Sequence, residues 1–64
     1  MIAPGTLVRI WGGASLWSPT TQKRAFAESK GLVALVVGSE FGRVFVYVSD
    51  QVWWCRPDSV ARVP

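Results

Sequence analysis

The chain contains no histidine and only one cysteine, and these two shortages exclude much of the chemistry that small proteins use. Zinc sites, catalytic triads and imidazole acid–base chemistry normally need a histidine. Cys55 has no second cysteine with which to form an internal disulfide, which fits a reducing compartment. We therefore expect no metal ion, no cofactor and no small-molecule substrate.

Acidic residues are also few, and their positions suggest no catalytic pair. The four of them fall in predicted loops and turns, at Glu28, Glu40, Asp50 and Asp58. No spacing among them brings two carboxylates together, and no phosphate-binding glycine loop or nucleophile motif occurs. The sequence therefore predicts a protein that is not an enzyme. Seven basic residues against four acidic ones give a net charge of +3, which is only a mild bias toward anionic partners.

Long hydrophobic runs are absent too. The longest one, Leu32–Val37, has six residues and is far too short to span a membrane. Residues 1–5 lack the basic stretch and apolar stretch of a secretory signal, so a soluble, cytoplasmic protein is expected. Sixty-four residues make one domain, 1–64, of which half are apolar. So much apolar surface is difficult to bury in a small domain, which favours self-association or docking onto a larger body.

The hydrophobic pattern predicts an all-β domain of five short strands. Alternation or a short apolar run, bounded by turn residues, marks each of them: Thr6–Trp11, Leu32–Val37, Arg43–Val48, Val52–Arg56 and Val60–Val63. Four connections join them: a long first loop at Ala14–Lys30, a hairpin connection at Gly38–Gly42, a tight turn at Ser49–Gln51 and a single 3₁₀ turn at Pro57–Ser59. Gln22–Ser29 could instead form two turns of helix, but Phe26 is its only large apolar residue, so a loop is favoured.

This order of elements resembles the SH3-like barrel family, and particular segments are similar too. The segment Gly5-Thr6-Leu7-Val8-Arg9-Ile10 resembles the family's first strand, Gly31–Val36 its second and Arg43–Val48 its third. The segment Trp53–Val63 resembles the family's tryptophan strand, Pro-containing turn and final strand. The chain looks most like the small stand-alone SH3-like proteins of tailed bacteriophages. That resemblance implies a five-stranded barrel that serves as a virion or accessory component, in the host cytoplasm or the virion.

One enzyme family has this fold, the type II dihydrofolate reductases, which form a tetramer around a central pore. Their pore strand carries a Val-Gln-Ile-Tyr motif shortly before the final turn. The corresponding stretch here is Val52-Trp53-Trp54-Cys55, which does not match.

The strongest functional candidate is the outer face of the third and fourth predicted strands. It holds Phe45, Tyr47 and one of the two adjacent tryptophans, with Arg43 and Arg56 nearby. Trp, Tyr and Arg are the residue types that dominate binding hot spots. The alternative is that the long first loop folds over this face and buries it as a second small core.

Strand alternation decides between Trp53 and Trp54. Neighbouring side chains on a strand point to opposite faces, so Trp53 and Cys55 share one face. Cys55 is expected in the core as a small, inert apolar group. If the strand alternates regularly, Trp54 faces outward and Trp53 inward, so Trp54 is the preferred partner-binding residue and Trp53 the alternative.

Two further tryptophans and one apolar strand carry open alternatives. Trp11 and Trp17 flank the Gly12-Gly13 bend and could pack on each other over the open end of the barrel; they are expected to be structural but could extend the aromatic surface. The outward residues of Leu32–Val37 either lie beneath the long loop or meet a neighbouring subunit.

We therefore expect a non-enzymatic interaction or structural module whose partner is another protein or a second copy of itself. The alternative is a nucleic-acid-binding barrel that combines the same aromatics with basic contacts. Those contacts would come from Arg9, Arg43, Lys23, Arg24 and Lys30, although a solvated loop is the simpler interpretation of the Lys23-Arg24 pair.

Overall fold

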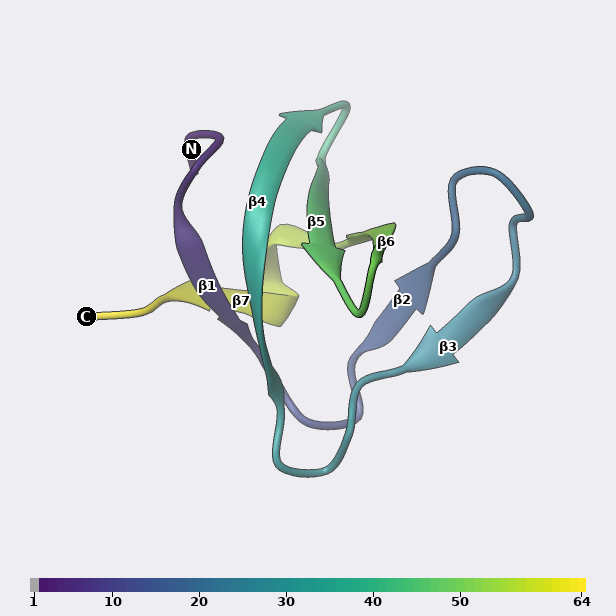
Figure 1. The fold of residues 1–64 in the computed structure, drawn as a ribbon, viewed down its shortest axis with the longest axis horizontal. Coiled ribbons are helices and arrows are strands. Elements are labelled where there is room, and N and C mark those ends of the chain that lie inside the picture. The colour runs from purple at the N-terminus through teal and green to yellow at the C-terminus, as the bar shows by residue number, and fades with distance from the viewer. Residues whose placement is uncertain (1) are drawn as a thin grey trace.

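The computed structural model describes residues 2–64, which form a single sheet of seven antiparallel strands. The strand order is β3-β2-β6-β5-β4-β1-β7, and the sheet curls around a central core (Figure 1). The strands are β1 (Leu7–Ile10), β2 (Ser15–Trp17), β3 (Arg24–Phe26), β4 (Leu32–Glu40), β5 (Arg43–Val48), β6 (Gln51–Cys55) and β7 (Val60–Arg62). The only helical element in this part of the chain is the 3₁₀ turn η1 (Pro57–Ser59). The all-β prediction and the 3₁₀ turn before the last strand are confirmed.

The structure has seven strands where the sequence pattern predicted five. Both additional strands lie in residues 14–30, which the pattern assigned to an irregular loop or a helix. β2 and β3 form a short hairpin, and β2 joins the sheet through one pairing with β6, Trp17 opposite Trp54. Three residues are too few for an alternation to be recognised, and the pairing that places them spans 37 positions of sequence. The place of the β2–β3 hairpin in the sheet therefore depends on its tertiary contact with β6.

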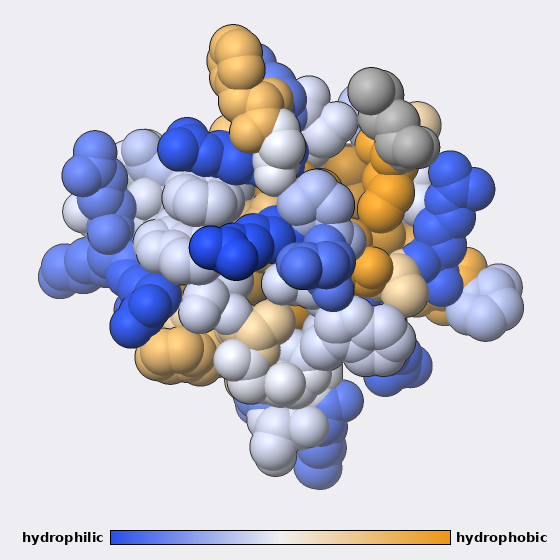
Figure 2. All heavy atoms as spheres, turned by 180° about the vertical axis from the view of Figure 1, so that it is seen from behind, coloured by the Kyte–Doolittle hydropathy of each residue, from blue (hydrophilic) through white to orange (hydrophobic). Residues whose placement is uncertain are grey.

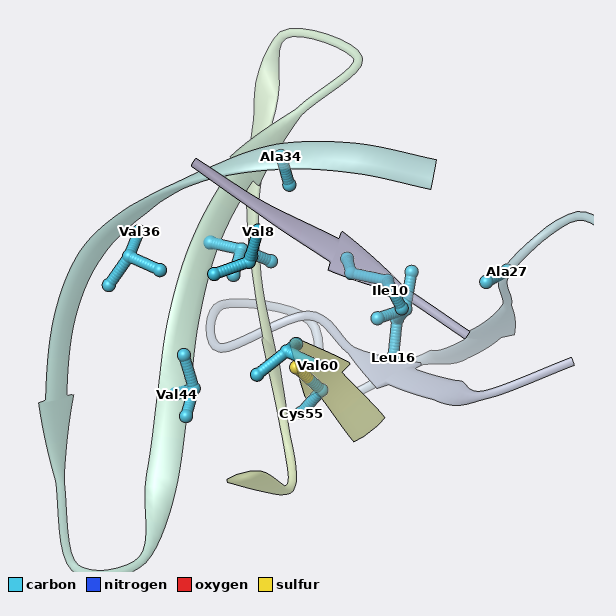
Figure 3. Close-up of a cluster of buried hydrophobic side chains, with 10 residues drawn as sticks. Val8, Ile10, Leu16, Ala27, Ala34, Val36, Val44, Cys55 and Val60 are labelled. Carbon is cyan, nitrogen blue, oxygen red and sulfur yellow. The ribbon is translucent and has the colours of Figure 1, made fainter. Parts of the chain in front are cut away.

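The core lies on the inner side of the curled sheet. Alternate residues of β1, β4 and β5 point into it, as expected from the two-residue period of a strand (Figure 3). Ten residues are buried there, from β1, β2 and β4 to β7 and from the segment after β3: Val8, Ile10, Leu16, Ala27, Ala34, Val36, Val44, Val46, Cys55 and Val60. The predicted outward side of Phe45 and Tyr47 on the third predicted strand, and the inward Cys55, are confirmed.

β4 is longer than predicted and carries a bulge. It continues to Glu40 because the register with β5 shifts between Val36 and Gly38, so that pairing resumes beyond the glycine. The expected five-residue connection at Gly38–Gly42 shrinks to the two residues Phe41 and Gly42. The turn after β5 likewise contains only Ser49 and Asp50, because β6 begins at Gln51.

Two glycines allow the long β1–β4 connection to close tightly at its base. A Cβ on Gly12 would meet the carbonyl oxygen of Ser29. Gly31 has a φ of +82°, and a Cβ there would lie 2.6 Å from the carbonyl oxygen of Ile10. Both positions therefore need glycine: Gly12 because of the limited space, and Gly31 because of the limited space and its positive φ.

Candidate interaction surface

A row of apolar side chains crosses four strands on the outer face of the sheet. The register places Leu7 of β1 opposite Leu35 of β4, Leu35 opposite Tyr47 of β5, and Tyr47 opposite Val52 of β6. Leu7 is 52% exposed, Leu35 38% and Tyr47 44%. We call these four residues the apolar row. Because they are directly opposite in register, they form one continuous strip across the sheet.

Val33 and Val37 extend the apolar row along β4. They alternate with buried residues, so they point to the same outer face as Leu35, and both are exposed. The β2–β3 hairpin does not cover them, because it lies beyond β6 at the other end of the strand order (Figure 1). The alternative in which the first loop covers the outward side of this strand is therefore wrong. No described part of the chain buries this face.

A second row, of aromatic residues, lies beside the first. Phe45 of β5 is opposite Trp54 of β6, and Trp54 is opposite Trp17 of β2. The Trp17 and Trp54 rings are stacked, with centroids 4.4 Å apart and planes 16° from parallel. The guanidinium carbon of Arg43 lies 4.4 Å from the centroid of the Trp54 ring. Since β2 and β5 flank β6 on opposite sides, Trp54 is held between an indole and a cation.

The prediction that Trp54 faces outward is confirmed, and its setting differs from the one expected. Trp54 is half-buried by its neighbours, so it is less available to a partner than an isolated outward indole would be. Trp53 pairs with the buried Val46 and packs against the core. As a partner-binding candidate Trp53 is therefore corrected to a residue of the core side.

The packing of the remaining tryptophans, Trp11 and Trp17, also differs from the packing considered from the sequence. Trp17 stacks on Trp54 and not on Trp11, since β2 takes it into the sheet beside β6. Trp11 follows β1 and is half exposed, while its backbone N–H donates to the carbonyl oxygen of Ser59. The two residues are therefore on different parts of the surface. Trp17 belongs with the aromatic row, and Trp11 does not.

The basic residues do not come together into one strip. Arg24 lies opposite Trp17, with its guanidinium carbon 5.1 Å from the Phe26 ring centroid, and shares a shallow polar hollow with Arg56. Lys23 lies in the β2–β3 turn and Lys30 in the turn before β4. Arg9 is on β1, four strands away from β2 in the sheet order. The set proposed from sequence for nucleic-acid contact is therefore spread over separate elements.

Sequence reasoning missed Leu7 and Val52 as surface candidates. It identified the apolar run of β4 as a possible contact with a neighbouring subunit, but had no register to align that run with Leu7. It also missed Phe41, which is 93% exposed in the β4–β5 turn. The available signal was an aromatic residue directly before a glycine in a hairpin turn, where Asn or Asp is the common choice.

Within residues 2–64 no three His, Cys, Asp or Glu side chains gather in a group that could hold a metal ion. Burial raises the pKa of the Cys55 thiol to about 11, with a smaller contribution from the charge of Asp58, so its reactive thiolate form is disfavoured. None of the helices described is long and apolar enough to cross a bilayer.

Comparisons with protein-family models, with curated proteins and with solved structures found no match to this chain.

Proposed function

We propose that the chain is a non-enzymatic SH3-like barrel that self-associates through the outer face of its sheet. Support for the fold comes from the order of elements: a long connection after β1, two hairpins through β4, β5 and β6, a 3₁₀ turn, and a last strand that pairs with β1. The resemblance of the opening and closing segments to small phage proteins supports a role as a virion or accessory component. The same face would serve for docking onto a larger assembly.

The observation that carries the proposal is the uncovered apolar row. With Val33 and Val37, its side chains expose on the order of 400 Å² of contiguous apolar surface, in the range where the largest patch on a small protein is often functional. Nearly a tenth of the molecule's 4353 Å² of accessible surface thus belongs to one apolar patch. On a sheet face that meets only water, the outward residues are normally polar. The exposed face is therefore better explained by a second surface that packs on it.

A protein surface fits this face better than a nucleic acid does. Bases bind to sheets by stacking on free aromatic faces, and Trp54 has an indole on one side and a guanidinium on the other. The centre of the patch is aliphatic, at Leu35, with Leu7 and Val33 beside it. Aliphatic side chains gain by packing on another apolar surface, and a second curled sheet of the same shape can supply that.

The test is sedimentation equilibrium of the wild-type chain and of two variants of the apolar row. Leu35→Glu places a charge at the centre of the row, and Tyr47→Thr removes its aromatic ring while keeping a residue suited to strands. We expect both to weaken self-association at least about tenfold, because each removes at least ~1.4 kcal/mol of apolar contact. Ser29→Glu adds the same charge on an exposed turn away from the face and serves as the matched control.

Folding is checked in each variant by circular dichroism. Self-association that is equally strong in both folded row variants and in the wild type would contradict the proposal. Strong binding to single-stranded DNA that falls steeply with salt would favour the nucleic-acid alternative.

A further inference from the structure

Phe41 lies at the tip of the β4–β5 hairpin with almost its whole side chain in solvent. It is 93% exposed, the most exposed large hydrophobic residue described. Figure 2 shows a hydrophobic projection at the end of the molecule where β4 turns into β5. Singly exposed apolar residues are common on surfaces, so exposure alone would mean little.

The backbone at Phe41 makes the exposure significant. Phe41 and Gly42 both have positive φ, +52° and +72°, which is the pattern of a two-residue I′ hairpin turn. That turn favours Asn, Asp or Gly at its first position, and a bulky residue there is a genuine outlier. Local conformational preference and solvation thus both disfavour phenylalanine at this site. Strain of this kind persists where a function uses it, which points to a contact made by the Phe41 ring.

An apolar hollow lies directly beside the tip. It has a volume of about 320 Å³, and its apolar lining comes from Ile2, Val44 and Pro57. Phe41 itself forms part of its rim, but the ring is too exposed to fill it. A cavity of about 150 Å³ is enough to hold a benzene-sized ring. The hollow therefore has room for a phenyl ring from another molecule.

We propose that Phe41 enters this hollow on a second copy of the chain, reciprocally, across a two-fold axis at the hairpin tip. A projecting side chain that lies next to a hollow of matching size makes a surface that is self-complementary under a two-fold rotation. Each copy then places its own ring in the hollow of the other. Charge supports the same arrangement. Glu40 and Arg43 are opposite each other in register beside the turn and both border the hollow, so a two-fold axis there gathers residues of opposite charge around the contact.

This contact is distinct from the apolar row. The tip lies at the end of β4 and β5, whereas Leu35 and Tyr47 lie within those strands on the outer face. A chain with two different two-fold contacts builds assemblies larger than a dimer. One aromatic side chain per copy makes a small interface compared with the usual ~800 Å² per partner, so a dissociation constant of about micromolar or weaker is expected for the tip contact alone.

The experiment measures association by sedimentation equilibrium up to about 1 mM, a range set by the weak affinity expected for so small a contact. Phe41→Asn removes the ring and supplies a residue that suits the turn, and Ile2→Asp places a charge in the hollow. We expect each to raise the dissociation constant of the tip contact at least about tenfold. Phe26→Thr, which removes another strongly exposed phenylalanine, should leave it unchanged.

The background variant Leu35→Glu separates this contact from the one on the outer face. In that background the tip contact should remain as a dimer, and adding Phe41→Asn should give a monomer. A dimer that persists in the Leu35→Glu, Phe41→Asn double variant would overturn the tip proposal, as would a monomeric Leu35→Glu protein at 1 mM. Loss of association with Phe41→Asn but not with Leu35→Glu would instead contradict the outer-face proposal alone.

A second measurement is independent of assembly. If the ring is present for the contact and not for the fold, Phe41→Asn should raise the melting temperature of the monomer at low concentration, because Asn accepts a positive φ more easily. A lower melting temperature would show that Phe41 serves its own fold, and the proposal would fail.

Discussion

The Trp17–Trp54 stack should fasten the β2–β3 hairpin to the rest of the sheet, which a double-mutant cycle can measure. β2 pairs with β6 only at these two residues, and their rings are 4.4 Å apart and nearly parallel. Replacing Trp54 by alanine removes the stack and the contact with Arg43 together. The perturbation therefore reports on a long-range pairing that the sequence did not reveal.

The expected magnitude follows from these contacts. A stacked aromatic pair contributes about 0.5–1.5 kcal/mol beyond its buried area, and a partly exposed cation–π contact about 0.5–1 kcal/mol. With the apolar area that a half-buried indole loses, Trp54→Ala should lower the free energy of unfolding by about 2–3 kcal/mol. Domains of this size have roughly 3–5 kcal/mol of stability in total. The variant should therefore be marginally folded, which makes Trp54 a poor probe of surface binding.

The assay is urea unfolding followed by circular dichroism for the wild type, Trp17→Ala, Trp54→Ala and the double variant. We expect a coupling free energy of about 1 kcal/mol between the two sites. Tyr47→Thr is the control, because Tyr47 is on the same face, one row away, and its hydroxyl donates only an exposed hydrogen bond to Asp50; its cost should be below about 1 kcal/mol. A Trp54→Ala cost below about 0.5 kcal/mol, with no coupling, would refute the account of the stack.

Three further predictions concern the base of the long connection and the buried thiol. Gly12→Ala should lower the urea midpoint strongly because its Cβ would meet the Ser29 carbonyl oxygen, whereas Gly38→Ala, with open space around it, should change the midpoint little; equal effects would contradict the steric argument. Cys55 should react with a thiol reagent at pH 8 only as fast as the chain unfolds, and rapid labelling of the folded protein would show that it is not buried. Because its pKa rises from 9.0 to about 11 on folding, the thiol's contribution to stability is complete below pH 9 and is lost as the pH rises through 11, so wild type should lose more stability than Cys55→Ala over that interval.

Much of the fold could be predicted because its signals are local. Alternation in β5 and β6 placed Val44 and Val46 inward, Phe45 and Tyr47 outward, and, through Cys55, selected Trp54 over Trp53. Such inferences need only the two-residue period of a strand. Boundaries were less accurate, most clearly at β4, where a bulge extends the strand beyond the expected turn.

The surface could be predicted only in part because it depends on register. Leu7 and Leu35 are separated by the whole β1–β4 connection, and nothing local says that they lie side by side. The same holds for Trp17 and Trp54, whose stacking turned an expected binding tryptophan into a partly structural one. Each strand's outward residues were identifiable, but their assembly into one apolar row was not.

The sequence by itself determined the all-β class, the positions of the two short hairpin turns, the 3₁₀ turn and the inward faces of β5 and β6, because these follow from side-chain period and turn chemistry over a few residues. Only the tertiary structure decided which outward side chains become neighbours, how the β2–β3 hairpin joins β6, and that an apolar hollow lies beside Phe41. Those features arise where strands distant in sequence are brought into register, and register is a property of the whole sheet.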